Sequence, residues 1–87
     1  VEVHCRGNVS PGRIRKSIEP LPEVVAAYTV SGAADAIVHL RAADIHHLED
    51  ALERLRGVDI IDRTVSTVVL STLLERPPSP SPPPGPG

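Results

Sequence analysis

The sequence predicts an α+β domain in which helices cover one side of an antiparallel sheet. Stretches with an apolar residue at every second position alternate with two stretches in which apolar residues recur every three or four positions. These spacings are typical of half-buried strands and amphipathic helices, respectively. Glycine, proline and helix-capping residues fall between the stretches, where turns and helix ends belong.

The first two predicted elements are a short strand and a short helix. Val1–Arg6 alternates apolar and polar side chains, which predicts a strand with one buried face. Ser10 and Pro11 supply an N-cap and a residue suited to the first helical turn. Ile14 and Ile18 lie four apart on one helix face, and two nearby prolines end the helix.

Two further strands joined by a glycine loop predict a hairpin. Val24–Ser31 is apolar on both of its faces, which suggests that helices cover one face and a partner covers the other. Its even-numbered face is predicted to carry four side chains together: Val24, Ala26, Tyr28 and Val30. Asp35–Arg41 resumes the alternation, and Gly32 between the strands can adopt the positive φ of a tight loop.

The second helix and the last strand complete the order. Asp44 is the expected N-cap, and Gly57 is placed to end the helix. The stripe between them consists of apolar residues at three- and four-residue steps: Ile45, Leu48, Leu52 and Leu55. Val58–Leu73 is rich in β-branched residues but longer than an ordinary strand. We therefore expect a bend or bulge near Asp62–Thr64.

The order β-α-β-β-α-β is that of the ferredoxin-like fold, an antiparallel sheet with two helices on one face. We expect it to occupy residues 1–76 of the 87. Residues 77–87, rich in Pro, Ser and Gly, are expected to form a disordered tail, with a PxxP pattern that leaves open an SH3-type partner. A chain this short buries only about 60 % of its unfolded surface, so a monomer would be marginally stable.

Composition excludes several classes of function. Nine Lys and Arg against eleven Asp and Glu give a net charge of −2, which argues against direct nucleic-acid binding by this chain alone. Tyr28 is the one aromatic residue, so base-stacking platforms and aromatic cages are ruled out. A single cysteine excludes an internal disulfide and a cysteine-based zinc site. Without a long apolar stretch or a signal-peptide pattern, a soluble, cytoplasmic protein with no membrane contact is expected.

The four histidines and the cysteine do not form a catalytic or metal-binding pattern. His46 and His47 are adjacent on a helix, so their side chains diverge by about 100°. His4 and His39 fall on separate predicted strands, with no supporting ligand motif. Cys5 has no neighbour in sequence that would activate it. We expect no metal, no cofactor and no enzymatic activity.

Two blocks of the sequence resemble the Lrp/AsnC transcription regulators. Leu21–Val25 leading to Tyr28–Asp35 resembles the family's "PEV…Y.VSG..D" block. Arg56–Val58, followed by Arg63–Leu70, resembles the "GV…T.T.IVL" that closes the same domain. The resemblance covers roughly residues 1–76 and is to the C-terminal half of those proteins, the effector-binding and oligomerisation module called the regulation of amino acid metabolism (RAM) domain.

The resemblance implies a homodimer of the dimeric α/β-barrel type, in which two sheets pack face to face, and larger rings such as octamers. It also implies an amino-acid effector bound between subunits near the glycine loop. The residues expected to contact the effector are Tyr28, Ser31, Gly32, Asp35, Thr64, Ser66 and Thr67. Gly32 would admit the effector's carboxylate to backbone N–H groups, and Asp35 would pair with its ammonium group.

Each of these residues also has an ordinary structural interpretation. Gly32 and Asp35 suit a hairpin loop, hydroxyl and β-branched residues are common in strands, and Tyr28 suits an interface or a core. Two other functions stay open: an oligomerisation module without a ligand, and a dimeric α/β-barrel enzyme using His39 or His4. The family's helix-turn-helix is missing from this stretch, so we expect an excised fragment or a stand-alone domain that reaches DNA only through a separate domain.

Overall fold

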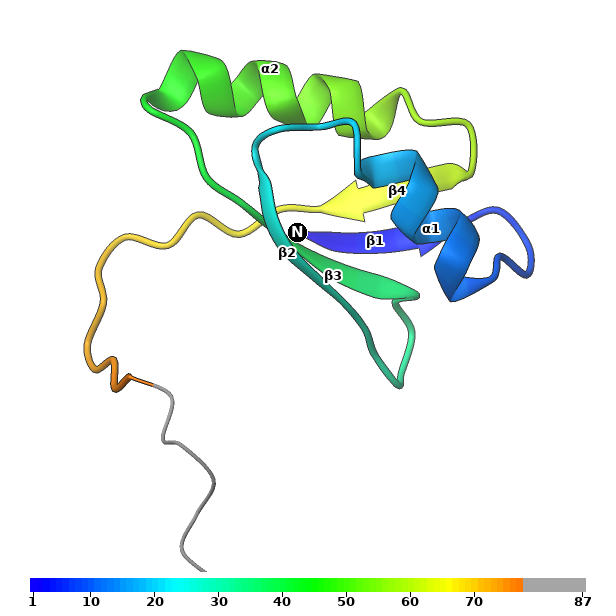
Figure 1. Cartoon of the computed structure of the whole chain (residues 1–87), viewed down its shortest axis with the longest axis horizontal. Helices are drawn as coiled ribbons and strands as arrows, with labels where there is room; N and C mark the ends of the chain where they lie inside the picture. Colours follow the sequence, from blue (N-terminus) through cyan, green and yellow to red (C-terminus); the bar gives the residue numbers. More distant parts are fainter. Residues whose placement is uncertain (78–87) are drawn as a thin grey trace, which may run out of the picture.

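The computed structural model describes residues 1–77, and over this range two helices pack on one face of a four-stranded antiparallel sheet (Figure 1). The elements in chain order are β1 (Glu2–Cys5), α1 (Pro11–Ile18), β2 (Val24–Thr29), β3 (Ala36–Leu40), α2 (Ile45–Arg56) and β4 (Ile61–Val65). The strands are arranged β2-β3-β1-β4, so β2 and β4 are the two edges. The predicted ferredoxin-like α+β fold is confirmed. The predicted tail lies outside the described residues, apart from Pro77.

Helix α1 begins and ends where its local sequence predicts. The Ser10 hydroxyl accepts a hydrogen bond from the backbone N–H of Arg13 at 3.3 Å, and Pro11 occupies the first helical turn. Ile14 and Ile18 are the buried residues of this helix. A side-chain cap and two isoleucines four residues apart are therefore enough to place α1 on the sheet.

Helix α2 is also capped as predicted, but it is rotated relative to the predicted stripe. Asp44 Oδ1 accepts the backbone N–H of His47 at 2.9 Å and lies 2.8 Å from the ring Nδ1 of the same residue. Ala51 and Leu55 are the buried residues, whereas Ile45 is 54 % exposed. Ala51 and Leu55 lie four positions apart on the buried side of the helix, and Ile45 lies outside that side.

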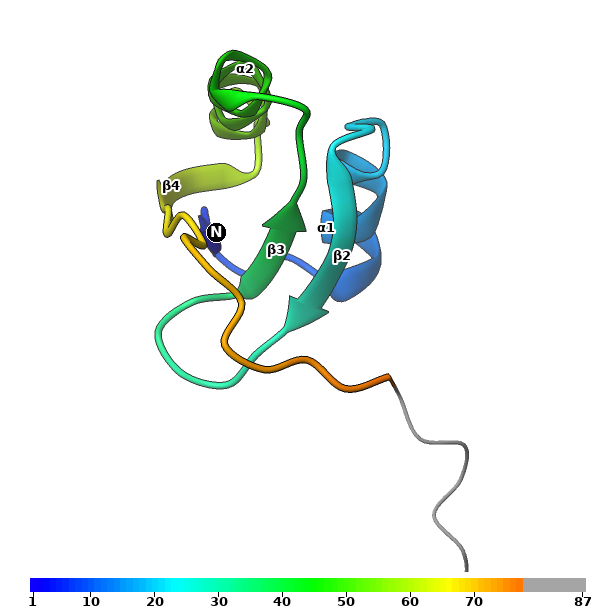
Figure 2. The ribbon, with the colours of Figure 1, turned by 90° about the vertical axis from the view of Figure 1, so that its left-hand side faces the viewer.

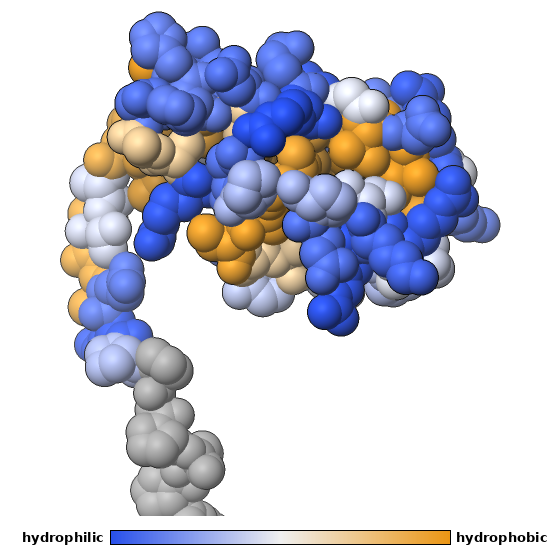
Figure 3. Space-filling view, turned by 45° about the horizontal axis from the view of Figure 1, so that its top comes forward, coloured by the Kyte–Doolittle hydropathy of each residue, from blue (hydrophilic) through white to orange (hydrophobic). Residues whose placement is uncertain are grey.

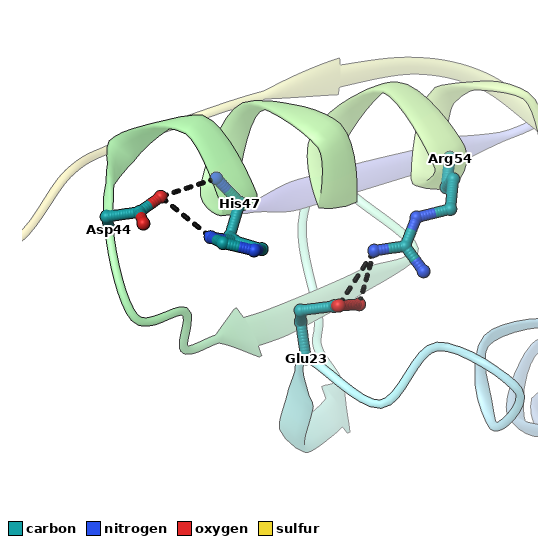
Figure 4. A network of polar contacts seen from close by, with 4 residues as sticks. All are labelled: Glu23, Asp44, His47 and Arg54. Atoms are coloured by element: carbon teal, nitrogen blue, oxygen red, sulfur yellow. Dashed lines mark hydrogen bonds and ion pairs between the residues drawn. The ribbon is translucent and has the colours of Figure 1, made fainter.

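An ion pair ties α2 to the start of β2 (Figure 4). Arg54 Nη2 donates to both carboxylate oxygens of Glu23 at 2.7 Å, and the Glu23 side chain is only 15 % exposed. The backbone carbonyl of Glu23 accepts the N–H of Arg41 at 2.8 Å. The hydrogen bond from Arg54 lowers the pKa of the Glu23 carboxyl. Glu23 thus joins α2, β2 and the end of β3.

The central strand β1 sets the register of the sheet. Val3 lies opposite Ala36 of β3 on one side and Thr64 of β4 on the other. The pairing with β4 then shifts between His4 and Cys5, so Asp62 has no paired residue on β1. The irregularity predicted near Asp62–Thr64 is confirmed as a bulge.

A second bulge in β2 overturns the predicted face of that strand. Val24 pairs with Leu40 but Ala26 pairs with His39, so Val25 is an extra residue. Because one extra residue reverses the alternation, Val24 lies on the helix-covered face with Leu40, whereas Ala26 and Tyr28 lie on the opposite face. Grouping Val24 with Ala26 and Tyr28 was therefore wrong.

The last strand is much shorter than predicted. Only Ile61–Val65 is β4, and residues 66–77 have no regular structure. Val65, the last residue of β4, lies opposite Glu2 of β1. After β4, residues 66–69 pass beside β3 and line a hollow with His39 and Leu40, and the chain then leaves the domain (Figure 2).

The core lies between the sheet and the helices and is wholly aliphatic, as the composition requires. Its fully buried large side chains are Leu55, Val3 and Val38. The other members of the cluster are Ile14, Ile18, Leu21, Ala36, Ile60 and Ile61. This one cluster holds both helices to the same face of the sheet.

Shortening Leu55 to alanine is expected to lower the free energy of unfolding by about 2–5 kcal/mol, because it leaves a cavity in a fully buried site. Urea denaturation measures the change. The matched control is Ile45→Ala in the same helix, where the side chain is 54 % exposed and the expected change is within about 0.5 kcal/mol. Equal losses in both variants would contradict the described packing of α2.

The Glu23–Arg54 pair predicts a pH-dependent contribution to stability. A carboxyl with a lowered pKa in the folded state stabilises the fold above its unfolded-state pKa, and this contribution is lost as the pH falls through the folded-state value. Glu23→Gln should therefore be less stable than the parent at about pH 7, with the difference shrinking towards about pH 3. The pKa of Asp44 is also lowered, mainly by the backbone hydrogen bond from His47. Asp44 is present in both proteins, so its contribution to the pH dependence cancels in the difference. A pH-independent difference in thermal unfolding would refute this.

Candidate functional site

The sheet face turned away from the helices is uncovered within residues 1–77. Its side chains come from alternate positions of all four strands: Ala26, Tyr28, Ile37, His39, Glu2, His4, Arg63 and Val65. Tyr28 is 56 % exposed and its ring meets His39 edge-on, with ring centroids 5.5 Å apart. Val65 is 41 % exposed. This open face is thus a mixed surface of apolar, aromatic and charged groups, suited to contact with another protein surface.

The glycine loop between β2 and β3 combines an open backbone with a fixed carboxylate. Gly32 has φ +113° and open space on the side where a Cβ would stand, which confirms the predicted positive φ. Asp35 Oδ2 accepts the backbone N–H of Cys5 at 2.7 Å, and the N–H of Asp35 donates to the carbonyl of Val3 at 2.9 Å. Ser31 is exposed in the same loop. Asp35 therefore has a structural role, holding the loop on β1, beside any role in binding.

The remaining predicted site residues lie on and just after β4. Thr64 is half-buried opposite Val3, whereas Ser66 and Thr67 follow the end of β4 and are exposed. β4 leaves the sheet where β1 begins, and the glycine loop is held where β1 ends. One chain thus places the glycine loop and the Ser66–Thr67 pair at opposite ends of β1, with Thr64 between them.

Two hollows lie near these groups. The end hollow, about 430 Å³, is lined by Ser66 and Thr67 together with His39, Leu40 and Arg41. The edge hollow, about 660 Å³, lies between α1 and β2 and has apolar walls that include Ile14, Ile18 and Val24. Neither of these two hollows is lined by the glycine loop.

Arg41 is a candidate binding residue that the sequence did not single out, and it lines the end hollow beside His39, which the sequence suggested only for an enzyme. No hydrogen bond or ion pair from residues 1–77 engages the Arg41 guanidinium. With the hydroxyls of Ser66 and Thr67 it lines a hollow that offers donors to a small anion or carboxylate. In the sequence, Arg41 is only a cation at the end of a predicted strand. Such cations are common at solvated strand ends, so the sequence gave no reason to select it.

Other chemistry has little support in the described part of the chain. Burial, and secondarily the charge of Asp35, raises the pKa of the Cys5 thiol, which keeps it protonated. No group of three or more His, Cys, Asp or Glu side chains among residues 1–77 is arranged to hold a metal ion. Within the same range, no helix is long and apolar enough to cross a bilayer.

Two substitutions separate the structural role of Asp35 from a role in binding. Asp35→Ala removes the acceptor for the Cys5 N–H and should lower the free energy of unfolding by about 1 kcal/mol. Asp35→Asn keeps an amide oxygen at that place, so it should lose less stability while losing the negative charge. Urea denaturation of both variants measures this, and equal stability of Asp35→Ala and the parent would contradict the described hydrogen bond.

Comparison with known proteins gives a consistent family assignment. The chain matches the Lrp/AsnC ligand binding domain over residues 1–79. It is 47 % identical over 78 residues to the HTH-type transcriptional regulator Rv2324 of Mycobacterium tuberculosis (strain ATCC 25618 / H37Rv), a match that covers 90 % of this chain and 53 % of the regulator. The chain therefore spans about half the length of that regulator.

A second relative is an enzyme, and the similarity is to a small part of it. The chain is 26 % identical over 73 residues to the homocitrate synthase of Sulfurisphaera tokodaii (strain DSM 16993 / JCM 10545 / NBRC 100140 / 7), covering 84 % of this chain and 16 % of the enzyme. No solved structure matches the chain. The family match over almost the whole fold, the identity to a regulator and the βαββαβ order agree with the sequence resemblance, and the chain belongs to the Lrp/AsnC ligand-binding domain family.

Proposed function

We propose that this domain binds a small effector, an amino acid, at the boundary between two subunits, and that binding shifts the assembly of a transcriptional regulator. The observation that carries the proposal is the separation of the candidate residues. The glycine loop and the Ser66–Thr67 pair lie at opposite ends of β1 in one chain. A pocket using both groups needs a second subunit to bring them together.

The open face supports a homodimer formed by stacking two sheets. Tyr28 is 56 % exposed, and Val65 is 41 % exposed. A sheet covered by helices on one side buries its other side best against another sheet, at a spacing of about 10 Å. Because the resemblance to the Lrp/AsnC family implies larger rings, the proposal also includes rings such as octamers.

The chemistry of the two residue groups suits a zwitterion. An amino acid needs donors for its carboxylate and an acceptor for its ammonium group. The open backbone at Gly32 and the guanidinium of Arg41 supply donors, and hydroxyls are available at Ser66 and Thr67. Asp35 uses Oδ2 for the N–H of Cys5 and retains Oδ1 as an acceptor for the ammonium. Tyr28, and Thr64 on β4, would border the bound effector.

The proposed mechanism is a shift of populations. An effector that contacts two subunits stabilises the assembly that holds both contacts, and it does nothing to states that lack them. In a full-length regulator, this shift would reposition the helix-turn-helix domains on DNA in the cytoplasm. The net charge of −2 leaves DNA binding to those domains.

One alternative is an assembly module without an effector. The observation in its favour is that neither of the two hollows reaches Gly32 or Asp35 in a single chain. An enzyme is less well supported, because the similarity to homocitrate synthase covers only 16 % of that protein and the described residues show no catalytic constellation.

A thermal-shift screen of the full chain against the twenty amino acids tests the proposal. A ligand at 100 times its dissociation constant adds about 2.7 kcal/mol to the stability, so one or a few amino acids should raise the melting temperature clearly. Asp35→Asn is the matched control: it keeps the acceptor for Cys5 and should lose the shift. If no amino acid shifts a chain that sedimentation shows to be oligomeric, the alternative of an assembly module is correct.

A further inference from the structure

The four histidines of the chain form two pairs on different sides of the domain. His4 of β1 and His39 of β3 lie on the open face, because the valine before each of them is fully buried on the helix side. His46 and His47 are exposed in the first turn of α2, a helix whose outer side is covered by hydrophilic side chains (Figure 3). Stacking two open faces therefore places the first pair inside the contact and leaves the second pair outside it.

The surroundings of His39 carry more positive than negative groups. On β2, Ala26 lies opposite it and the Tyr28 ring meets it edge-on, with ring centroids 5.5 Å apart. Arg41 lines the end hollow beside it, where the chain after β4 adds hydroxyl and apolar groups. The charged amino terminus donates to the carbonyl of the residue before it at 2.9 Å. A carboxylate, that of Glu2, lies one diagonal step away on β1.

His4 lies between a cation and a carboxylate. Arg63 of β4 is directly opposite it on one side. On the other side, the N–H of Asp35 continues the pairing of β3 with β1, and the Asp35 carboxylate already accepts a backbone N–H of β1. Glu2 is the preceding residue of β1 on the same face. Within residues 1–77, neither His4 nor His39 forms an ion pair with a carboxylate.

Protonation of these two histidines gives the open face a positive charge. Within residues 1–77, the other charged groups on the face or at its end are Glu2, Asp35, Arg63, Arg41 and the amino terminus. The Arg6–Asp62 ion pair beside the face is neutral as a unit. Histidine side chains take up protons as the pH falls from about 8 to about 5. A second copy presents the same charges, and repulsion between like charges is strongest where water is excluded.

We propose that His4 and His39 make the contact between two open faces sensitive to protons, so that the dimer forms when both side chains are neutral and separates as they become charged. Such a dimer holds fewer protons than two separate chains, and a falling pH therefore favours separation. His39 carries the larger part, because cations border it, whereas His4 has Asp35 beside it. The inference rests on the sheet-stacked dimer of the proposed function and adds the condition under which that dimer forms.

Sedimentation of the full chain at about pH 7 and about pH 5.5 tests the proposal. The dimer dissociation constant should rise at least about tenfold at the lower pH, because the histidines take up protons in this range. In His4→Gln with His39→Gln the side chains stay polar but do not titrate, so the constant should change less than about twofold. Of the single variants, His39→Gln should remove more of the rise than His4→Gln. An equal rise in the parent and the double variant overturns the proposal.

The other two histidines supply the matched control. His46→Gln with His47→Gln removes the same number of imidazoles from α2, outside the contact, and should keep the full rise of the parent. The ring Nδ1 of His47 lies 2.8 Å from Asp44 Oδ1, so circular dichroism checks that every variant stays folded at both pH values. If the α2 variant loses the rise, the pH dependence comes from the charge of the whole chain, and the assignment to the open face is wrong.

The two proposals fail separately. A dimer that binds an amino acid but keeps the same dissociation constant at both pH values leaves the proposed function standing and refutes the proton sensitivity. A dimer that weakens at low pH as expected but binds no amino acid leaves the proton sensitivity standing without the effector. A parent chain that sediments as a monomer at both pH values and all concentrations refutes the proton sensitivity and the dimer on which it rests.

Discussion

The one-sided cover of the sheet is the constraint on which the rest of this structure depends. Val3 and Val38 are fully buried because α1 and α2 close over the face that carries them. The same arrangement leaves Tyr28 and Val65, on the other face, in contact with water. A small aliphatic core with no aromatic side chain to enlarge it offers limited stability. Burying the second face of the sheet would therefore add to the stability of the domain. The location of the candidate site follows from this, since its residues border the uncovered face and its ends.

Local signals in the sequence were sufficient for the helices and for the order of elements. Ser10 before Pro11 and Asp44 before α2 are caps whose hydrogen bonds involve residues only three positions away, so they can be read without knowing the fold. The strand details depend on pairing partners elsewhere in the chain. Val25 is a bulge because Ala26 pairs with His39, and the bulge at Asp62 follows from the pairing of His4 with Arg63 and of Cys5 with Ile61. The apolar run continues well beyond Val65, so propensity alone predicted a longer strand than the pairing within residues 1–77 forms.

The candidate site shows the same limit. The positive φ of Gly32 is a property of one residue in a loop and was predictable. The hydrogen bond between Asp35 and the N–H of Cys5 joins residues thirty positions apart, and nothing in either residue's neighbourhood indicates it. The separation of Gly32 from Ser66 likewise depends on the direction of β1 and β4. Residue types therefore indicated the chemistry of a site, while the sheet decides how that chemistry is divided within one chain.

The position of Asp35 links the two surfaces that matter for the proposed function. Its carboxylate and its N–H both hold β1, through Cys5 and Val3, and β1 also carries Glu2 and His4 on the open face. A ligand that draws on the Asp35 carboxylate therefore acts on the strand at the centre of that face. Coupling between two sites is reciprocal in free energy, so a subunit that packs against β1 must in turn affect the glycine loop. In the proposed function, this short path of one side chain would connect effector binding directly to assembly.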